Sequence, residues 1–320
     1  MVQRLALDAG QSGVRAIVVR GSERPQIELD LSRHRGIRTD LPVAAQLADV
    51  VRRVHADVGA LDAVAIGATG FTGTDDLREL SALGGLGIRS VSVAHDSVTS
   101  YLGALGAEQG VVVAAGTGVV TLAVGASSSA RVDGWGNIMG DAGSGYWFGR
   151  AALTAALRAY DGRGPTTLLL NRVREEFGDV EDAYLQLQAD PGHIRRTASF
   201  SRWVTDAEAD GDAVAAEICR RGAAELALAV TSGLARVGLQ EERSGAETWS
   251  STADGPAVCA MGGLFQSEAV GRAFVAALQR RVPTFRLTVP RGDGVSGAVE
   301  LLALPEEHPL TSRSTTLTLR

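Results

Sequence analysis

The sequence contains no lysine, and all 31 basic residues of this 320-residue chain are arginine. A Walker A phosphate loop needs a lysine to reach the nucleotide phosphates, and a Schiff-base enzyme needs its amine. Both classes are therefore excluded. Asparagine is nearly absent too, since it occurs only at Asn137 and Asn171.

Cysteine and histidine are scarce. The two cysteines, Cys219 and Cys259, have no CxxC spacing, which excludes a disulfide framework and argues against a cluster site. The five histidines show no paired ligand spacing. We therefore expect no structural metal.

The chain also lacks a positive charge excess and any long apolar run. Its net charge is −6, so no basic field attracts nucleic acid or anionic lipid. No signal peptide and no run of membrane-spanning length is visible. We expect a soluble cytoplasmic protein of two domains, with small-molecule substrates, no nucleic-acid or membrane partner, and a homodimer as the candidate assembly.

In the first third of the chain, short strand-like runs alternate with helical patterns, which predicts an α/β fold. A glycine turn joins the first two strands as a hairpin. The strands are predicted at residues 5–7, 14–19, 64–67 and 91–93. The helices are predicted at 42–58, at 75–83, and through Leu105 after a cap at His95-Asp96.

A second unit then repeats this layout. Strands at 111–115 and 119–124 flank Gly116-Thr117-Gly118, which suggests an internal duplication. The remaining predictions are helices over 150–239 (including 212–237), a surface loop at 241–255, a strand at 258–261 and a last helix at 296–304. The predicted domains are 1–109 and 110–304, with helix 296–304 a candidate to pack back on the first, followed by a disordered polar tail at 305–320.

The loop from Asp8 to Gly13 lies between two strands, whereas a dinucleotide-binding loop lies between a strand and a helix. Small residues let its backbone amides approach an anion, and Asp8 could hold a hydrated Mg²⁺. A simple hairpin turn is the alternative for this loop, and on the loop alone it is favoured. Gly116-Thr117-Gly118 repeats the design, and two such loops could pinch a polyphosphate.

Asp96 follows a predicted strand and opens a helix. It is either a helix N-cap or a general base at the carboxyl end of a strand, where open α/β sheets bind ligands. Residues 133–149 contain six glycines, two tryptophans and two aspartates. This composition favours a loop that stacks an aromatic ring on a sugar and offers it carboxylates, over a glycine-rich surface crossing.

Taken together, these segments resemble the BadF/BadG/BcrA/BcrD ATPase family, and within it the N-acetylglucosamine kinase branch. The resemblance rests on the Asp8 loop, Val112–Gly118, Gly134-Trp135-Gly136, Gly140–Gly145 and Met261-Gly262-Gly263, in order from residue 5 to about 304. It implies two duplicated actin-like (ribonuclease H-like) α/β domains around a nucleotide cleft.

The resemblance also implies a role for particular residues. Asp96 takes the place of the catalytic aspartate, and Asp8 that of the residue holding Mg²⁺ through water. The ATP- and phosphate-binding residues implied are Asp8, Gly10, Gln11, Ser12, Gly13, Gly116, Thr117, Gly118, Gly222, Ala223, Gly262 and Gly263. The sugar-binding candidates are Thr39, Asp40, Thr69, Gly70, Asp96, Trp135, Gly136 and Asp141.

The chain departs from the family pattern at three places. The first loop usually reads Asp-Gly-Gly-Gly-Thr, but Ala9, Gln11 and Ser12 stand here. The sugar-contacting asparagine is replaced by the stretch 36–40, and the glutamate after the loop aspartate by Ala142. Phosphate binding should survive these changes, whereas acetamido specificity is the property they affect.

The expected function is transfer of the γ-phosphoryl group of ATP to the 6-hydroxyl of an amino sugar, with N-acetylglucosamine favoured and glucosamine or N-acetylmuramic acid as alternatives. A second class is an activator-type ATPase with a bridging iron–sulfur cluster, against which stand two cysteines predicted to be buried. A third is a non-catalytic regulator, disfavoured because no helix-turn-helix segment precedes Leu5.

Overall fold

The computed structural model describes residues 3–11, 13–21, 26–29, 35–239 and 255–319. They form two compact units, each with its own sheet and core. Unit 1 takes its described residues from 1–110, 124–129 and 289–320, and unit 2 from 111–123 and 130–288. The C-terminal segment from residue 289 thus belongs with the N-terminal one, whereas the sequence placed residues up to 304 in the second domain and offered only helix 296–304 as a candidate to pack on the first.

Unit 1 is built on a mixed sheet with the strand order β11-β5-β4-β1-β2-β3. The β1–β2 hairpin is antiparallel and places Asp8 opposite Arg15, while β4 runs parallel to both β1 and β5. Runs such as Leu5–Leu7 are fully buried, which is why they form central strands. The strands are β1 (Gln3–Ala9), β2 (Val14–Arg20), β3 (Gln26–Leu29), β4 (Ala63–Ala68), β5 (Ser90–His95) and β11 (Ser314–Thr318).

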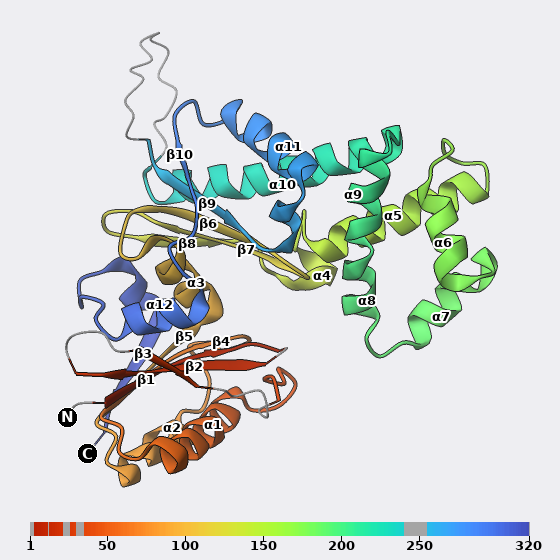
Figure 1. The fold of residues 1–320 in the computed structure, drawn as a ribbon. Helices are drawn as coiled ribbons and strands as arrows, with labels where there is room; N and C mark the ends of the chain where they lie inside the picture. The colour runs from red at the N-terminus through yellow and green to blue at the C-terminus, as the bar shows by residue number, and fades with distance from the viewer. Residues whose placement is uncertain (1–2, 12, 22–25, 30–34, 240–254, 320) are drawn as a thin grey trace. The chain divides into compact units, whose positions relative to one another are not determined.

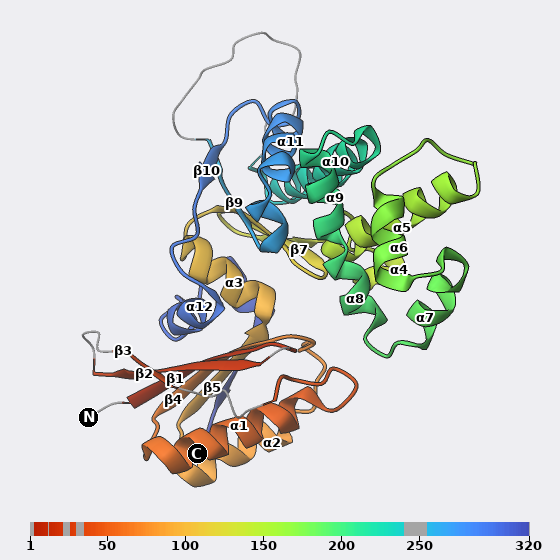
Figure 2. The same ribbon diagram turned by 45° about the vertical axis from the view of Figure 1, so that its right-hand side comes forward.

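Helices cover both faces of this sheet, α1 and α2 on one and α3 and α12 on the other (Figures 1 and 2). The apolar positions of α1 are buried with the predicted 3.6-residue rhythm. The helices are α1 (Val43–Val58), α2 (Arg78–Ser81), α3 (Asp96–Leu105) and α12 (Gly294–Leu301), with 3₁₀ turns at Ala82–Leu86 and Pro309–Arg313.

The prediction of a disordered tail after residue 304 is wrong. Strand β11 pairs antiparallel with β5 over five residue pairs, and Leu310 is 0% exposed. The segment is polar because it forms a sheet edge, where only alternate side chains face inward. Its order comes from backbone hydrogen bonds that its composition does not reveal.

Unit 2 contains a second sheet with the order β10-β9-β6-β7-β8. Five strands of unit 1 have the matching order β5-β4-β1-β2-β3. The predicted duplication is therefore confirmed at the level of topology. The strands are β6 (Gly110–Ala115), β7 (Val119–Val124), β8 (Ser129–Val132), β9 (Ala257–Met261) and β10 (Arg286–Thr288).

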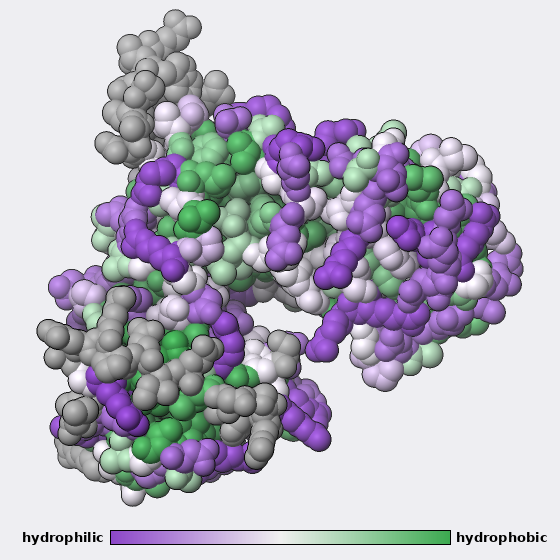
Figure 3. Space-filling view, in the orientation of Figure 1, coloured by the Kyte–Doolittle hydropathy of each residue, from purple (hydrophilic) through white to green (hydrophobic). Residues whose placement is uncertain are grey.

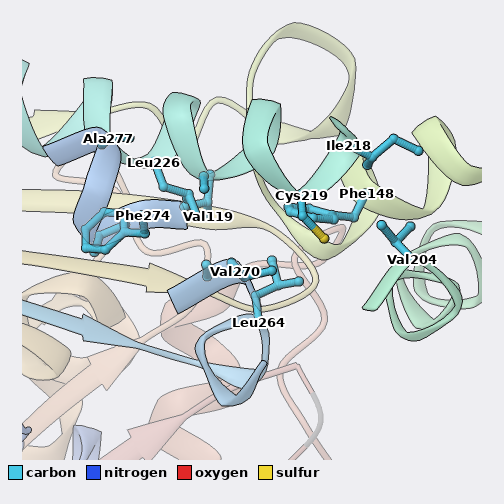
Figure 4. Packing of buried hydrophobic residues seen from close by; sticks show 14 of the residues in the cluster. Val119, Phe148, Val204, Ile218, Cys219, Leu226, Leu264, Val270, Phe274 and Ala277 are labelled. Carbon is cyan, nitrogen blue, oxygen red and sulfur yellow. The ribbon is translucent and has the colours of Figure 1, made fainter. Parts of the chain in front are cut away.

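The core of unit 2 lies between its sheet and helices α10 and α11, where Val119, Leu226 and Phe274 pack (Figure 4). Helices α5–α9 form a further layer whose visible surface is largely hydrophilic (Figure 3). The helices are α4 (Gly136–Met139), α5 (Gly145–Tyr160), α6 (Leu169–Phe177), α7 (Ala183–Ala189), α8 (His193–Ser199), α9 (Ser201–Ala209), α10 (Ala213–Arg236) and α11 (Glu268–Gln279).

The predicted helix 212–237 matches α10, and Asp212 is its N-cap. The surface loop predicted at 241–255 lies, apart from Gly255, outside the described residues. Among the helices of the described ranges, none is both long and apolar enough to cross a membrane.

Candidate active site

The first glycine loop, between β1 and β2, is closed by a hydrogen bond from Gly10 N to Gly13 O of 3.0 Å. The segment after it packs directly on the loop: Ile37 N donates to Gly10 O at 2.8 Å, and a Cβ at Gly36 would lie 2.0 Å from Gln11 O. Gln11 is exposed, and Ser12 lies outside the described residues. Gly36 and Ile37 therefore pack against the described part of this loop.

Asp8 stands next to the loop with its carboxylate 23% exposed. Burial raises the pKa of Asp8 above its usual value. Hydrogen bonding and charge interaction with Arg15 offset part of this rise, and the negative charges of Asp96 and Asp293 add smaller increases. Arg15 Nη2 lies 3.0 Å from Asp8 Oδ2. Three carboxylates and one arginine thus converge in unit 1.

Asp96 is the first residue of α3, immediately after β5. The N-cap is His95, whose Nδ1 lies 3.2 Å from Ser97 N and 2.9 Å from Asp96 Oδ1. The same ring nitrogen thus lies within hydrogen-bond distance of both partners. The N-cap interpretation of Asp96 is therefore wrong, because the neighbouring histidine provides the cap.

The surroundings of Asp96 favour its charged form. Burial raises the pKa of Asp96, but hydrogen bonding and charge interaction with His95, together with hydrogen bonds from Thr69 and the Ser97 backbone, bring it below its usual value. Thr69 also donates its backbone N–H to Ala9 O at 3.0 Å, beside the first loop. A deprotonated, partly buried carboxylate at the carboxyl end of a strand can accept a proton from a bound hydroxyl.

Two of the predicted sugar-binding segments lie together in unit 1. A Cβ at Gly70, whose φ is +71°, would lie 2.6 Å from Thr39 Cγ2. Asp40 is exposed and forms an ion pair with Arg38 at 2.5 Å. The turn after β4 and the stretch 36–40 are therefore neighbours, and the Asp40 carboxylate already has a cationic partner.

The second glycine loop, in unit 2, is fastened to the start of α5. Gly145 N donates to Gly116 O at 2.8 Å, and Tyr146 N donates to Thr117 O at 3.0 Å. Gly116 and Thr117 are nevertheless exposed. The residues 143–149 predicted as part of a binding loop thus include the first turn of α5, capped by Ser144.

Asp133 and Asp141 hold the loop between β8 and α5 in a fixed shape. Both have positive φ, at 56° and 58°. Asp133 accepts from the backbone N–H of Asp141 and Ala142, and Asp141 Oδ1 accepts from Gly136 N at 3.1 Å. Burial raises the pKa of Asp141, which is 9% exposed. These carboxylates brace the loop, so the sugar-binding role of Asp141 stays a prediction.

The braced loop presents its aromatic residue outward. Trp135 is 58% exposed, and the Arg131 guanidinium lies 4.7 Å from its ring centroid. An indole held at the surface by a cation on one face can stack its other face on a sugar ring.

The glycines after β9 lie beside the second loop. Gly262 has φ +104°, and a Cβ there would lie 2.3 Å from Ala115 O. Gly263 is exposed and lines a cavity of about 200 Å³, together with Ser201, Arg202, Thr205, Leu264, Gln266 and Ser267. Unit 2 therefore brings three of its predicted nucleotide-binding residues, Gly116, Gly262 and Gly263, into one region.

The prediction that Gly222 and Ala223 contribute to the adenine wall is wrong. Ala223 is 0% exposed, and a Cβ at Gly222 would lie 2.3 Å from the Phe148 ring. Gly222 lets α10 pack closely on Phe148 of α5, and Ala223 lies in the core of unit 2. A nucleotide cannot contact residues that have almost no accessible surface.

The carboxylates of unit 1 suit magnesium, which prefers hard oxygen ligands and keeps several of its waters. Asp8 carries such oxygens. Position 294 is a glycine, and a Cβ there would lie 2.8 Å from the Asp8 carboxyl carbon. No group of three or more direct metal-ligating side chains occurs in the described parts of the chain. The carboxylate chemistry of Asp8 therefore fits Mg²⁺, and its binding through water stays a prediction.

Similarity to known proteins identifies the family of this chain. The model of the BadF/BadG/BcrA/BcrD ATPase family matches residues 7–302. The chain belongs to this family. An N-acetylmuramic acid/N-acetylglucosamine kinase of Clostridium acetobutylicum is 31% identical over 199 residues, and that match spans 57% of this chain and 61% of the relative's length.

Solved structures support the fold assigned to this BadF/BadG/BcrA/BcrD family member. A proposed N-acetylglucosamine kinase of Chromobacterium violaceum has a TM-score of 0.69 and 23% identity, over 94% of this chain and 99% of that one. A ROK family glucokinase of Streptomyces griseus, in complex with glucose and AMPPNP, has a TM-score of 0.51 and 17% identity, over 93% and 98%. The two-domain actin-like fold is therefore confirmed.

Two residues of the site in this family member were missed from the sequence, Arg15 and Asp293. The register of the first hairpin was a usable signal for Arg15, because it stands opposite Asp8. Asp293 lies between two glycines at the start of a predicted helix, a pattern that indicates only an N-cap.

The two cysteines are buried free thiols, at 2% and 0% exposure. The sulfur of Cys219 lies beside Phe148 in the core of unit 2 (Figure 4). Burial raises the pKa of the Cys219 thiol to about 12 and raises that of Cys259. Neither thiol has the exposed, ionisable character that a shared iron–sulfur cluster needs.

Proposed function

We propose that this protein is an ATP-dependent sugar kinase that transfers the γ-phosphoryl group to the 6-hydroxyl of an amino sugar, with N-acetylglucosamine as the favoured acceptor. The observation that carries the proposal is Asp96, a partly buried carboxylate with a lowered pKa at the carboxyl end of β5. The name of the Clostridium acetobutylicum relative supports the same reaction class.

In the proposed reaction, Asp96 accepts the proton of the sugar 6-hydroxyl as its oxygen forms a bond to the γ-phosphorus. The bond from that phosphorus to the β–γ bridging oxygen breaks, and ADP leaves with the electron pair. When bound, Mg²⁺ neutralises charge on the phosphates, and Asp8 would hold it through water. Thr69 and His95 keep Asp96 oriented and ionised.

The nucleotide-binding residues are assigned in two groups. In unit 1 these are the backbone amides of the first loop, with Gly10, Gln11, Ser12 and Gly13. In unit 2 they are Gly116, Thr117, Gly118, Gly262 and Gly263, and we place the adenosine group at the cavity that Gly263 lines. Glycine-rich backbone is suited to this task because bare amides can approach phosphate oxygens closely.

For the acceptor we assign Thr39, Thr69 and Gly70 in unit 1 and Trp135 with Gly136 in unit 2. Asp40 is ion-paired with Arg38, which disfavours a charged 2-ammonium group and so disfavours glucosamine. N-acetylmuramic acid is the second candidate, because the curated relative is named for both acetylated sugars.

A coupled assay of ADP release tests the proposal with N-acetylglucosamine, N-acetylmuramic acid, glucosamine and glucose side by side. We expect an acetylated amino sugar to give the highest kcat/KM. A higher value with glucosamine would overturn the specificity but keep the kinase. If no sugar accelerates ADP release above the sugar-free rate, the kinase assignment fails. Visible absorbance after anaerobic iron–sulfur reconstitution would then favour the activator class.

A further inference from the structure

Asp293, at the N-terminus of α12, uses its two carboxylate oxygens for two different tasks. Oδ1 caps the helix, accepting from Ser296 N at 3.1 Å and from Ser296 Oγ at 2.9 Å. Oδ2 accepts from Arg15 Nη1 at 2.6 Å. The helix cap therefore fixes the oxygen that Arg15 contacts.

The same guanidinium reaches Asp8. Arg15 Nη2 donates to Asp8 Oδ2 at 3.0 Å, so its planar fork joins two carboxylates that stand 285 positions apart in the chain. Arg15 is 48% exposed. An exposed ion pair with a single partner is worth at most about 1 kcal/mol, which leaves a long side chain free to rotate. A second partner restrains it.

The backbone of α12 also bears on Asp8. A Cβ at Gly294 would lie 2.8 Å from both Cγ and Oδ2 of Asp8 and 2.9 Å from Oδ1. The Asp8 carboxyl group is thus enclosed between the Arg15 fork and the first turn of α12.

Helix α12 is in turn locked onto α3, which begins with Asp96. A Cβ at Gly103 would lie 2.0 Å from Asp293 O, and a Cβ at Gly297 would lie 1.7 Å from Thr99 O. Only glycine permits this approach, so the start of α12 has a fixed position relative to α3. A residue there can therefore position Asp8 relative to Asp96.

We propose that Asp293 is a positioning residue, which holds Arg15 so that Arg15 fixes the orientation of the Asp8 carboxylate for the metal–nucleotide complex. This inference rests on the proposed function for the identity of that complex. It assigns no direct contact with substrate to Asp293.

Binding of Mn²⁺ in the presence of ADP, measured by electron paramagnetic resonance on the full chain, tests the inference without any sugar. Asp293→Asn keeps the cap acceptor but loses the charge that holds Arg15, and Arg15→Lys keeps the charge but loses the fork. We expect each to weaken Mn²⁺ affinity by roughly 10-fold, the lower end for partners of metal-binding carboxylates. In the kinase assay, KM for Mg–ATP should rise while KM for the sugar stays unchanged.

A double-mutant cycle decides the mechanism. If Asp293 acts through Arg15, Asp293→Asn in an Arg15→Gln background should add less than twofold to the loss. Arg291→Gln is the matched control, since Arg291 precedes this turn and pairs with Glu108 instead of Asp8. It should leave Mn²⁺ affinity within twofold.

Three results would overturn the inference: unchanged affinity in Asp293→Asn, losses that multiply independently in the double variant, or tighter Mn²⁺ binding in Arg15→Gln, which would make Arg15 a competitor of the metal. If Asp293→Asn fails to fold, Arg15→Gln alone must still show the loss, because Arg15 takes no part in the cap. Sugar phosphorylation is not needed for this readout, so failure of the kinase assignment is seen separately.

Discussion

Replacing Asp96 by asparagine tests its role as the general base without disturbing the fold around it. Asparagine keeps the size of the side chain, can still accept from Thr69, and cannot take up a proton at neutral pH. His95 is the N-cap of α3, and the asparagine oxygen can still accept from the Ser97 backbone as the carboxylate does, so the first turn keeps its acceptors. The substitution therefore removes the proposed proton acceptor and leaves the size and hydrogen bonding of the side chain largely unchanged.

The two expected magnitudes differ widely. Loss of a positioned general base costs about 10²- to 10⁴-fold in turnover, which corresponds to roughly 3–5 kcal/mol of barrier. For stability, loss of the charge near the N-terminus of α3 costs about 0.3–1 kcal/mol, and relief of its burial offsets part of this. We expect kcat to fall at least 100-fold while the melting temperature changes by a few degrees.

The assay is coupled ADP release with N-acetylglucosamine, accompanied by calorimetric measurement of ATP binding. Asp62→Asn is a matched control, because Asp62 is a partly buried carboxylate of unit 1 that accepts from Gln3 N at 2.8 Å and pairs with Arg89. It should retain full turnover. If Asp96→Asn turns over within threefold of the parent, the role of Asp96 as the base is refuted.

Three further predictions concern the same unit. Asp8→Ala should weaken use of Mg–ATP and leave sugar affinity, measured by calorimetry without nucleotide, unchanged; the reverse pattern would place the first loop at the acceptor. The loss of activity at low pH (the acid limb of the pH–rate profile) should reflect protonation of Asp8, whose pKa is raised, and not of Asp96, whose pKa is lowered. As pH falls Asp8 protonates first, so added Mg²⁺ should move this limb to lower pH, and a limb insensitive to Mg²⁺ in pH–rate profiles would contradict this. Removal of residues 306–320 should lower the melting temperature and promote aggregation in light scattering, because it exposes the edge of β5 and removes the buried Leu310, worth about 2 kcal/mol; an unchanged melting temperature would mean that β11 contributes nothing.

Most of the secondary structure could be predicted locally. Helix α1 follows from apolar periodicity, helix α10 from a long alanine-rich stretch, and the β1–β2 hairpin from apolar runs around a glycine turn. The candidate base was also visible, since Asp96 stands at a strand–helix junction. These features depend on residues a few positions apart, which is the range over which sequence patterns are informative.

Two outcomes depended on contacts between distant segments, and a third on the orientation of one side chain. Residues 314–318 are polar, yet they become a strand because β5 offers them a free edge. Gly222 and Ala223 lie where the family resemblance implied a nucleotide contact, but the packing of α10 against Phe148 buries them. The N-cap of α3 is His95 and not the predicted Asp96, because the imidazole ring is oriented to accept from Ser97 N.

The sequence by itself determined the α/β class, the duplicated glycine hairpins and the exclusion of lysine-dependent chemistry, because composition and local periodicity suffice for each. Only the tertiary structure decided that Arg15 and Asp293 join Asp8. That junction needs α12 to return to unit 1 and two glycines to let it approach α3, and no local pattern encodes the distance between segments so far apart in the chain.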